Sequence, residues 1–575
     1  MISNSVSLSS YTFSTGFVRS SHDSIEIASI MSGKGNSNYR FKFHYLCALI
    51  DLAYSWLRTI CFLFTKRLKQ KLFVQDLRKE PRLRRGRSLF TEWKTILRSQ
   101  TSNISSRPRG SAKRYEEIPM AKGWPLIGTT LELIAAGSAP NLHKYIDKRH
   151  QNFGHIFRER LGTQEAVFVS SANLMRSVFL YEGQYPAHPL PDSWVMYNKL
   201  HNCKRGLFFM DGPEWETNRK IMNRLLLNGN LNWLNSHIEY CTNNLINEWK
   251  SAAKSVEGYL KVDDLEGKLY KWAINVVCSV MFGYKDDDLN TKLKTTIDEF
   301  SKIVHKIFEN SAHLMNFPPK LARVLRLKIW TQFEKDVTEV LKVGGEIIDM
   351  QMKQSCELGW DNGLFVKMRL AGMSIEDIKR IFVDLIVAAG DTTAFSSQWA
   401  LYLLSQSNEI QTNIRRENFT NLSECPILQG LIKETLRLYP VAPFIGRYLK
   451  TDAIIGDYEV KKNVMVILSL YTSGRDAEHF PEPLDVQPDR WIRDPDTGHL
   501  RNVLQAHGTL PFAIGSRSCI GKKIALHQMY SLVSEVTRNF NVKCFNTKPI
   551  EVVLRLVAVP NAPIELGLKL LDKKH

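Results

Sequence analysis

The residues of this 575-residue chain that are best suited to chemistry surround one cysteine, Cys519, in the stretch PFAIGSRSCIG. Apolar residues at helical spacing follow it, so Cys519 lies at the start of a predicted helix. The free N–H groups and the dipole at a helix start favour an anion, which lowers the pKa of a thiol and gives a thiolate. Gly515 allows a tight turn, and Gly521 leaves space for a flat group.

Local chemistry leaves several roles open for this cysteine. A nucleophile needs a nearby base, and His507 or His527 could serve, although no spacing requires it. A zinc site needs further Cys or His ligands at short spacing, which the sequence lacks. A single thiolate beside Arg517, which can neutralise a carboxylate, suits haem. A buried structural cysteine and a haem ligand therefore both remain open at this point.

The stretch resembles the haem-binding signature of the cytochrome P-450 family, F-x-x-G-x-R-x-C-x-G. The matching residues are Phe512, Gly515, Arg517, Cys519 and Gly521. The resemblance implies haem b as the cofactor, with Cys519 as the axial iron ligand. It also implies that Phe512, Arg517 and Gly521 contact the cofactor. Ala513 stands where the family more often has glycine, and because alanine is small we expect the loop to close.

Two motifs upstream contain an acid and two arginines. Glu434 and Arg437, in ETLR, are three residues apart on a predicted helix, which alone is typical of a surface ion pair worth a few tenths of a kcal/mol. ETLR resembles the family motif E-x-x-R, and PDRW, which contains Arg490, resembles the P-x-R-[FW] that follows it. The resemblance implies that Glu434, Arg437 and Arg490 form a buried network beneath the haem.

Further arginines could bind the carboxylates of the cofactor. Trp215 and Arg219, in WETNR, lie on one face of a predicted helix, which alone indicates a cation–π pair at the surface. The resemblance implies that both reach a haem propionate, as does Arg447. With Arg517 this places three arginines around two carboxylates, and guanidinium groups bind carboxylates in a bidentate manner.

The stretch AAGDTT, residues 388–393, lies inside the longest periodic segment of the chain, residues 374–406. A threonine within a helix ordinarily donates to the carbonyl four residues earlier. The stretch resembles the family motif [AG]-G-x-[DE]-T, with Ala389 in place of a glycine. The resemblance implies a locally opened helix in which Asp391 and Thr392 relay protons during oxygen activation.

The elements that must position these motifs are mostly helical. Short β-type runs occur at 166–171, 453–460 and 464–470. We therefore expect a mainly α fold with small β-sheets, the cytochrome P-450 haem-thiolate fold, over residues 116–575. The sequence has no GxGxxG or Walker loop, so it shows no nicotinamide or flavin domain of its own, and its electrons must come from a partner.

The positive charge of the chain is concentrated in residues 1–115, which carry 21 Lys and Arg against 6 Asp and Glu, or +15 of the total of +19. This composition, rich in Ser and Arg and poor in acids, is typical of a mitochondrial presequence, and we predict a poorly ordered basic tether. Asp51 and Arg58 interrupt the apolar run 44–64, which favours an interfacial helix over a membrane span. The remaining chain is nearly neutral, so we expect no nucleic-acid partner.

The nine cysteines are scattered, odd in number and without a CxxC motif, which indicates a reducing compartment. The entry IPMAKGWPLIGT and the GKKIA after the cysteine resemble mitochondrial members of the family. Lys433 matches a ferredoxin contact of those members, although Gln429 replaces a second lysine. The resemblance implies an adrenodoxin-type ferredoxin with its NADPH-dependent reductase as partner, Lys433, Lys522 and Lys523 as contacts, and peripheral attachment to the matrix side of the inner membrane.

The substrate is expected to be apolar. Residues 185–215 and the apolar face near Phe382, Leu385 and Ala389 indicate a pocket with few polar anchors, which suits a sterol. The run RGLFFMDGPEW, with NRLLLNGNLNW after it, resembles insect mitochondrial ecdysteroid hydroxylases. The resemblance implies a monooxygenase that uses O2 to hydroxylate 2-deoxyecdysone at C2, giving ecdysone.

Three alternatives remain from the sequence. The steroid could be hydroxylated at C22 or C25, and a haem-thiolate gas sensor would bind a ligand without turnover. A family member that rearranges peroxides would need no proton relay, so the retention of Asp391 and Thr392 counts against that alternative.

Overall fold

The structure is a computed structural model, and it describes residues 112–228, 231–283, 291–315, 318–358, 363–417 and 422–571. The predicted N-terminal region 1–115 lies outside the described residues except for 112–115, and so does the interfacial helix predicted within 44–64. In the part of the chain that is described, no helix combines the length and apolar character needed to cross a bilayer.

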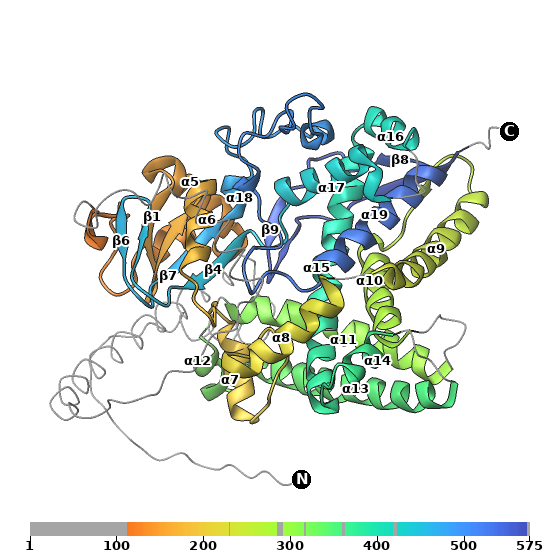
Figure 1. The fold of residues 1–575 in the computed structure, drawn as a ribbon, viewed down its shortest axis with the longest axis horizontal. Coiled ribbons are helices and arrows are strands. Elements are labelled where there is room, and N and C mark those ends of the chain that lie inside the picture. Colours follow the sequence, from red (N-terminus) through yellow and green to blue (C-terminus); the bar gives the residue numbers. More distant parts are fainter. Residues whose placement is uncertain are drawn as a thin grey trace, which may run out of the picture. The chain divides into compact units, whose positions relative to one another are not determined.

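Helices, eight of them long, make up more than half of the described chain (Figure 1). They are α8 (Gly212–Leu226), α9 (Asn232–Lys254), α10 (Leu265–Phe282), α11 (Thr291–Met315), α13 (Lys328–Leu358), α15 (Ile375–Ser405), α17 (Pro426–Leu438) and α19 (Lys522–Asn539). Shorter ones are α4 (Thr130–Ala135), α5 (Leu142–Phe153), α6 (Ala172–Leu180), α7 (Asp192–Leu200), α12 (Pro319–Val324), α14 (Leu364–Leu370), α16 (Asn408–Arg415) and α18 (Leu470–Ser473). The expected mainly α fold with small β-sheets is confirmed.

Helix α15 lies in the middle of the helical part and packs against α10, α13, α17 and α19. It begins at the predicted residue, because the hydroxyl of Ser374 caps it by accepting a hydrogen bond from the N–H of Asp377 at 3.0 Å. Most of its side chains are buried, among them Trp399 and Leu401 at 0% exposure. The helix that carries AAGDTT is therefore held by the core on most of its surface.

The largest sheet contains four strands in the order β1-β2-β7-β4. Their bounds are β1 (Ile156–Leu161), β2 (Gln164–Val169), β7 (Met465–Ser469) and β4 (Phe444–Tyr448). Strands β2 and β7 pair in parallel and the other neighbours pair antiparallel, so segments far apart in sequence meet here. Its register places Arg447 of β4 opposite Val466 of β7. This sheet therefore fixes one of the predicted propionate ligands.

The remaining sheets are small. They pair β5 (Ala453–Ile455) with β6 (Tyr458–Val460), β9 (Val552–Leu554) with β10 (Ala558–Pro560), and β11 (Leu566–Leu570) with β3 (Leu260–Lys261) and β8 (Phe540–Cys544). The three β-type runs of the sequence correspond to β2, to the β5–β6 pair and to β7. Those strand predictions are confirmed.

A close approach joins α17 to the 3-10 helix η6 (Pro488–Trp491). A Cβ atom on Gly430 of α17 would overlap the carbonyl oxygen of Pro488. Glycine is therefore required at residue 430, because only a bare backbone lets the segment that carries Arg490 lie directly on the helix that carries Glu434.

Replacing Gly430 by alanine should destabilise the protein by about 1–3 kcal/mol, because the added methyl group overpacks this contact. The midpoint and slope of urea denaturation measure the effect. Gly345 of α13 is a matched control, since a Cβ there has nothing within 4 Å. Alanine at residue 345 should instead stabilise the helix by up to about 1 kcal/mol. If alanine changed the free energy of unfolding equally at residues 430 and 345, the close contact between Gly430 and Pro488 would not explain the need for glycine.

Candidate active site

Cys519 lies three residues before α19, which begins at Lys522 with Gly521 as its N-cap. Its N–H donates to the carbonyl of Phe512 at 2.8 Å and closes the loop. Burial raises the pKa of the Cys519 thiol and outweighs the opposing effects of the Gly521 N–H and the charge of Arg219. The prediction that the helix start alone gives a thiolate is therefore wrong, although a bound metal cation deprotonates a coordinating thiol outright.

Cys519 is both accessible to solvent and surrounded by protein. By surface area the residue is exposed, yet desolvation by surrounding protein is the largest influence on the pKa of its thiol. The side chain is therefore accessible, although protein surrounds it closely enough to desolvate its thiol. A Cβ on Gly521 would approach only the Sγ of Cys519, at 3.9 Å, so this residue does not crowd the thiol.

Helix α15 has one open face in its otherwise buried middle. Leu385, Ala388, Ala389 and Thr392 retain exposure, whereas their neighbours Ile386, Val387, Gly390 and Asp391 are buried. The exposed residues are spaced i, i+3, i+4 and i+7, so they form one stripe of the helix. Phe382, which the sequence placed on this face, is instead fully buried against Phe282 at a ring distance of 4.9 Å.

The predicted relay residues lie on different sides of α15. Thr392 is on the open stripe, and its hydroxyl donates to the carbonyl of Ala388 at 2.7 Å, the ordinary contact of a threonine within a helix. Asp391 is 1% exposed, and its charge adds to the burial that raises the pKa of Tyr270 on α10. The helix is continuous from Ile375 to Ser405, so the expected local opening does not interrupt it.

Arg219 and Arg517 are the arginines nearest the cysteine loop. Arg219 is 7% exposed and donates from Nη2 to the carbonyl of Ser518 at 2.5 Å. Arg517 donates from Nη2 to the carbonyl of Met210 at 2.6 Å, and its guanidinium carbon lies 4.4 Å from the centre of the Trp215 ring. Trp215 thus makes its cation–π contact with Arg517, not with Arg219.

These two guanidinium groups have little counter-charge: Arg517 has the exposed Asp211 at 3.5 Å from its Nη2, a long and solvent-screened ion pair. Burial lowers the pKa of Arg219 to about 10 and the pKa of Arg517 to about 10. Each has a buried Nε that makes no hydrogen bond to the described residues. Buried cations with unsatisfied donors are stable only beside an anion, so the arginines fit the carboxylates of haem.

Arg447 has a different partner. Its Nε donates to Glu182 at 3.2 Å, and its Nη1 donates to the carbonyl of Gly446 at 2.9 Å. Glu182, which follows α6, is 4% exposed. No sequence motif contains Glu182, so it could not be predicted as part of the site. His188 also lies near the arginines, whose charges add to the burial that lowers the pKa of its imidazole to about 3.

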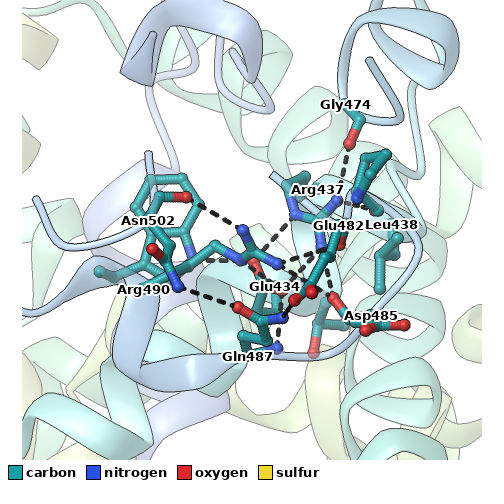
Figure 2. Close-up of polar contacts among 12 residues, drawn as sticks. Glu434, Arg437, Leu438, Gly474, Glu482, Asp485, Gln487, Arg490 and Asn502 are labelled. Atoms are coloured by element: carbon teal, nitrogen blue, oxygen red, sulfur yellow. Dashed lines mark hydrogen bonds and ion pairs between the residues drawn. The ribbon is translucent and has the colours of Figure 1, made fainter. Parts of the chain in front are cut away.

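Glu434, Arg437 and Arg490 form one cluster, and each of the three is 0% exposed (Figure 2). Arg437 binds both carboxylate oxygens of Glu434, with Nε at 2.8 Å from Oε1 and Nη2 at 2.7 Å from Oε2. Arg490 donates from Nε to Oε2 of Glu434 at 3.2 Å. The indole of Trp491 donates to Oε1 at 2.9 Å, a contact that the PDRW motif does not predict.

The two arginines of this cluster also bind main-chain carbonyls of the segment 474–502. Arg437 donates to Gly474 at 2.7 Å and to Asp485 at 2.9 Å, while Arg490 donates to Asn502 at 3.0 Å. One buried carboxylate thereby holds two guanidinium groups, and these hold an irregular segment that has little secondary structure of its own.

The remaining predicted residues lie around this centre. Phe512 is partly buried and has the Nζ of Lys522 at 5.9 Å from its ring centre. Lys522 and Lys523 are exposed, whereas Lys433 is half-buried with its Nζ 5.5 Å from the Trp491 ring centre. Lys522 and Lys523 are therefore more accessible to a partner protein than Lys433 is.

Ala513 adopts a φ of +54°, in the left-handed region. That conformation costs an L-residue about 1–2 kcal/mol, and glycine adopts it without this cost. The loop closes around alanine as expected, and the family preference for glycine at this position has a direct conformational reason.

Comparison with known proteins identifies the class of this site. The family model "Cytochrome P450" matches residues 118–568, so the chain belongs to the cytochrome P450 family. It is therefore a haem-thiolate monooxygenase of the mitochondrial type, and its cofactor is haem b.

Similar curated proteins come from several animals. "Cytochrome P450 315a1, mitochondrial" of Drosophila melanogaster is 50% identical over 476 residues, which cover 80% of this chain and 90% of that protein. "Cholesterol side-chain cleavage enzyme, mitochondrial" of Ovis aries is 26% identical over 485 residues, covering 81% and 91%. "Cytochrome P450 27C1" of Danio rerio is 26% identical over 485 residues, covering 80% and 88%.

Glu434→Gln should destabilise the protein by about 3–5 kcal/mol, because it leaves two buried guanidinium groups without their anion. Urea denaturation monitored by circular dichroism measures this loss. The control is Glu535→Gln, which removes the acid of another i,i+3 Glu–Arg pair, Glu535 with Arg538, at the surface of α19. That change should cost about 0.5 kcal/mol or less. Similar losses in both variants would refute a special role for the buried cluster.

Proposed function

We propose that this protein hydroxylates 2-deoxyecdysone at C2 to give ecdysone. The observation that carries the proposal is the 50% identity to a mitochondrial cytochrome P450 of the fruit fly along nearly the whole catalytic part of the chain. The runs RGLFFMDGPEW and NRLLLNGNLNW, which resemble the insect ecdysteroid 2-hydroxylase called Shadow, support the same substrate. A relative named for cleaving the side chain of cholesterol is compatible with a steroid substrate.

The open stripe of α15 suits such a substrate. Leu385, Ala388 and Ala389 present only apolar surface, and the hydroxyl of Thr392 is engaged with a backbone carbonyl. A pocket that is mostly apolar with few polar groups binds a rigid steroid skeleton by excluding water from it.

The segment that precedes α8 is pinned to the same helix. Arg205 donates to Oδ1 of Asp384 through Nε at 3.0 Å and Nη2 at 2.7 Å. Its guanidinium carbon lies 4.8 Å from the ring centre of Trp194 and 4.9 Å from that of Phe209. This buried ion pair holds part of the stretch 185–215 in one position beside the open stripe. The stretch can therefore act as a fixed wall of the substrate pocket.

Haem, when bound, supplies oxygen activation, and residues of the chain supply its ligand, its counter-charges and the proton relay. Cys519 would hold the iron, and Arg219, Arg517, Arg447 and Trp215 would bind the propionates. Thr392 donates a proton from the open face of α15, and the buried carboxyl of Asp391 replenishes it. Because the two relay side chains lie on different sides of the helix, we propose that Thr392 leaves the Ala388 carbonyl in each cycle.

The redox partner in this proposal is an adrenodoxin-type ferredoxin with its NADPH-dependent reductase. Lys522 and Lys523 are exposed at the start of α19, directly after the cysteine loop, so an acidic partner bound there lies near the haem. Lys433 contributes less than the sequence suggests, because it is half-buried and the charge of Arg493 adds to the lowering of its pKa.

The location in this proposal is the matrix side of the inner mitochondrial membrane, with peripheral attachment. Exposed apolar residues support it: Val324 is 77% exposed, Leu325 follows α12 at 56%, and Val195 and Leu200 of the contacting helix α7 are also exposed. A patch of this kind lowers its free energy by entering the interfacial region of a bilayer.

The full chain with adrenodoxin-type ferredoxin, its reductase, NADPH and O2 should convert 2-deoxyecdysone into a product hydroxylated at C2, identified by mass spectrometry and NMR. Precursors that lack the C22 or C25 hydroxyl form the comparison panel. Hydroxylation at C22 or C25 would reject the proposed position, and absence of turnover in a protein with an intact haem-thiolate spectrum would favour the gas sensor.

Thr392→Ala is the internal test of the relay in the same assay. It should lower product formation by about 10²-fold, the contribution of a positioned proton donor, while NADPH consumption continues and hydrogen peroxide accumulates. Unchanged product yield per NADPH would exclude Thr392 from the relay.

A further inference from the structure

Glu182 joins three parts of the fold at the cysteine loop. It lies two residues after the end of α6, its Oε2 accepts from Nε of Arg447 on β4 at 3.2 Å, and its Oε1 accepts from the N–H of Ser516 at 3.1 Å. The hydroxyl of Ser516 lies 3.3 Å from the same oxygen. One carboxylate therefore connects α6, the four-stranded sheet and the loop that ends in Cys519.

The loop is shaped around this carboxylate. Gly515 has a φ of +85°, and a Cβ there would overlap Oε1 of Glu182. Gly515 is thus required for two reasons, its conformation and the close approach of the glutamate. The family signature contains this glycine, but its second reason depends on a residue more than 300 positions earlier in the chain.

The hydrogen-bond donors around Glu182 favour its ionised form. Both carboxylate oxygens accept from N–H groups, one from a guanidinium and one from the main chain. Such donors stabilise the carboxylate and offer no acceptor for an added proton. Burial raises the pKa of Glu182, and the charge of Arg447 and the N–H of Ser516 act against this rise.

Glu182 supplies buried negative charge in this region, whereas Asp211, which lies 3.5 Å from Arg517, is 63% exposed and screened by solvent. Glu182 interacts electrostatically with Arg219 and Arg517 as well as with Arg447. Three buried guanidinium groups would exceed the two carboxylates of haem by one positive charge. A third carboxylate from the protein makes the numbers equal, which matters because an unpaired buried charge costs several kcal/mol.

We propose that Glu182 is a positioning residue of the haem-thiolate centre, which holds Arg447 and the Ser516 N–H in place and neutralises the third arginine beside the propionates. The inference rests on haem as the cofactor and is independent of which steroid is hydroxylated. It makes Glu182 a determinant of haem retention and of the electrostatic potential at the iron.

The consequence for the redox couple follows from Coulomb's law. A negative charge near the haem stabilises the ferric form relative to the ferrous form, and the effect is large in a site of low dielectric constant. Removing the charge while keeping the shape of the side chain should therefore shift the ferric/ferrous midpoint potential to a more positive value.

The test compares E182Q, E182D and E159Q in the full-length haem protein without substrate. Two quantities are measured: the midpoint potential by redox titration, and the rate of haem transfer to apomyoglobin. E182Q should shift the potential to a more positive value and release haem at least tenfold faster. E182D, which keeps the charge, should stay closer to the wild type in potential. E159Q removes a different carboxylate, 1% exposed, that accepts from Tyr145 at 2.6 Å, and should change neither quantity.

Wild-type potential and haem release in E182Q would overturn the proposal, and so would equal shifts in E182Q and E159Q. If E182Q yields no haem protein, E182D is the deciding variant. Haem binding by E182D would support the proposal that the negative charge is needed, and absence of haem binding in E182D would contradict the proposal. Because no readout involves a steroid, a wrong substrate in the proposed function cannot produce either result.

Discussion

The buried carboxylate of Glu434 is the interaction on which the cysteine side of this protein depends. It binds Arg437 in a bidentate manner and also accepts from Arg490 and Trp491, and the arginines use their remaining donors on carbonyls of an irregular segment. The network is complete in itself, because each charged group has its partner within the protein. It can therefore hold the segment 474–502 in one conformation, with the cysteine loop following in the chain.

The arginines beside Cys519 show the opposite situation. Arg219 and Arg517 are buried with pKa values lowered by desolvation. The buried carboxylate near them, Glu182, is taken by Arg447, and Asp211, which lies 3.5 Å from Arg517, is exposed to solvent. A protein interior tolerates such an excess of positive charge only if an anion from outside completes it. The contrast between the complete cluster at Glu434 and the incomplete one at Arg219 distinguishes a structural network from a cofactor site.

Much of this arrangement could be predicted from the sequence, since short motifs define local geometry. The start of α19 after Cys519 and the spacing of Glu434 and Arg437 follow from helix periodicity. Contacts between distant segments could not be predicted in this way. Glu182 belongs to no motif, and the burial that raises the pKa of the Cys519 thiol depends on the whole fold. Phe382 was assigned to the open stripe because apolar residues look alike in sequence, whether they line a pocket or fill the core.

The central claim is that Cys519 holds the haem iron as a thiolate, and the spectrum of the reduced protein with carbon monoxide tests it most directly. The account predicts a strongly red-shifted Soret band for the wild-type protein and loss of that shift in Cys519→His, with haem still bound through imidazole. A wild-type spectrum without the shift, or a Cys519→His variant that retains it, would contradict the account.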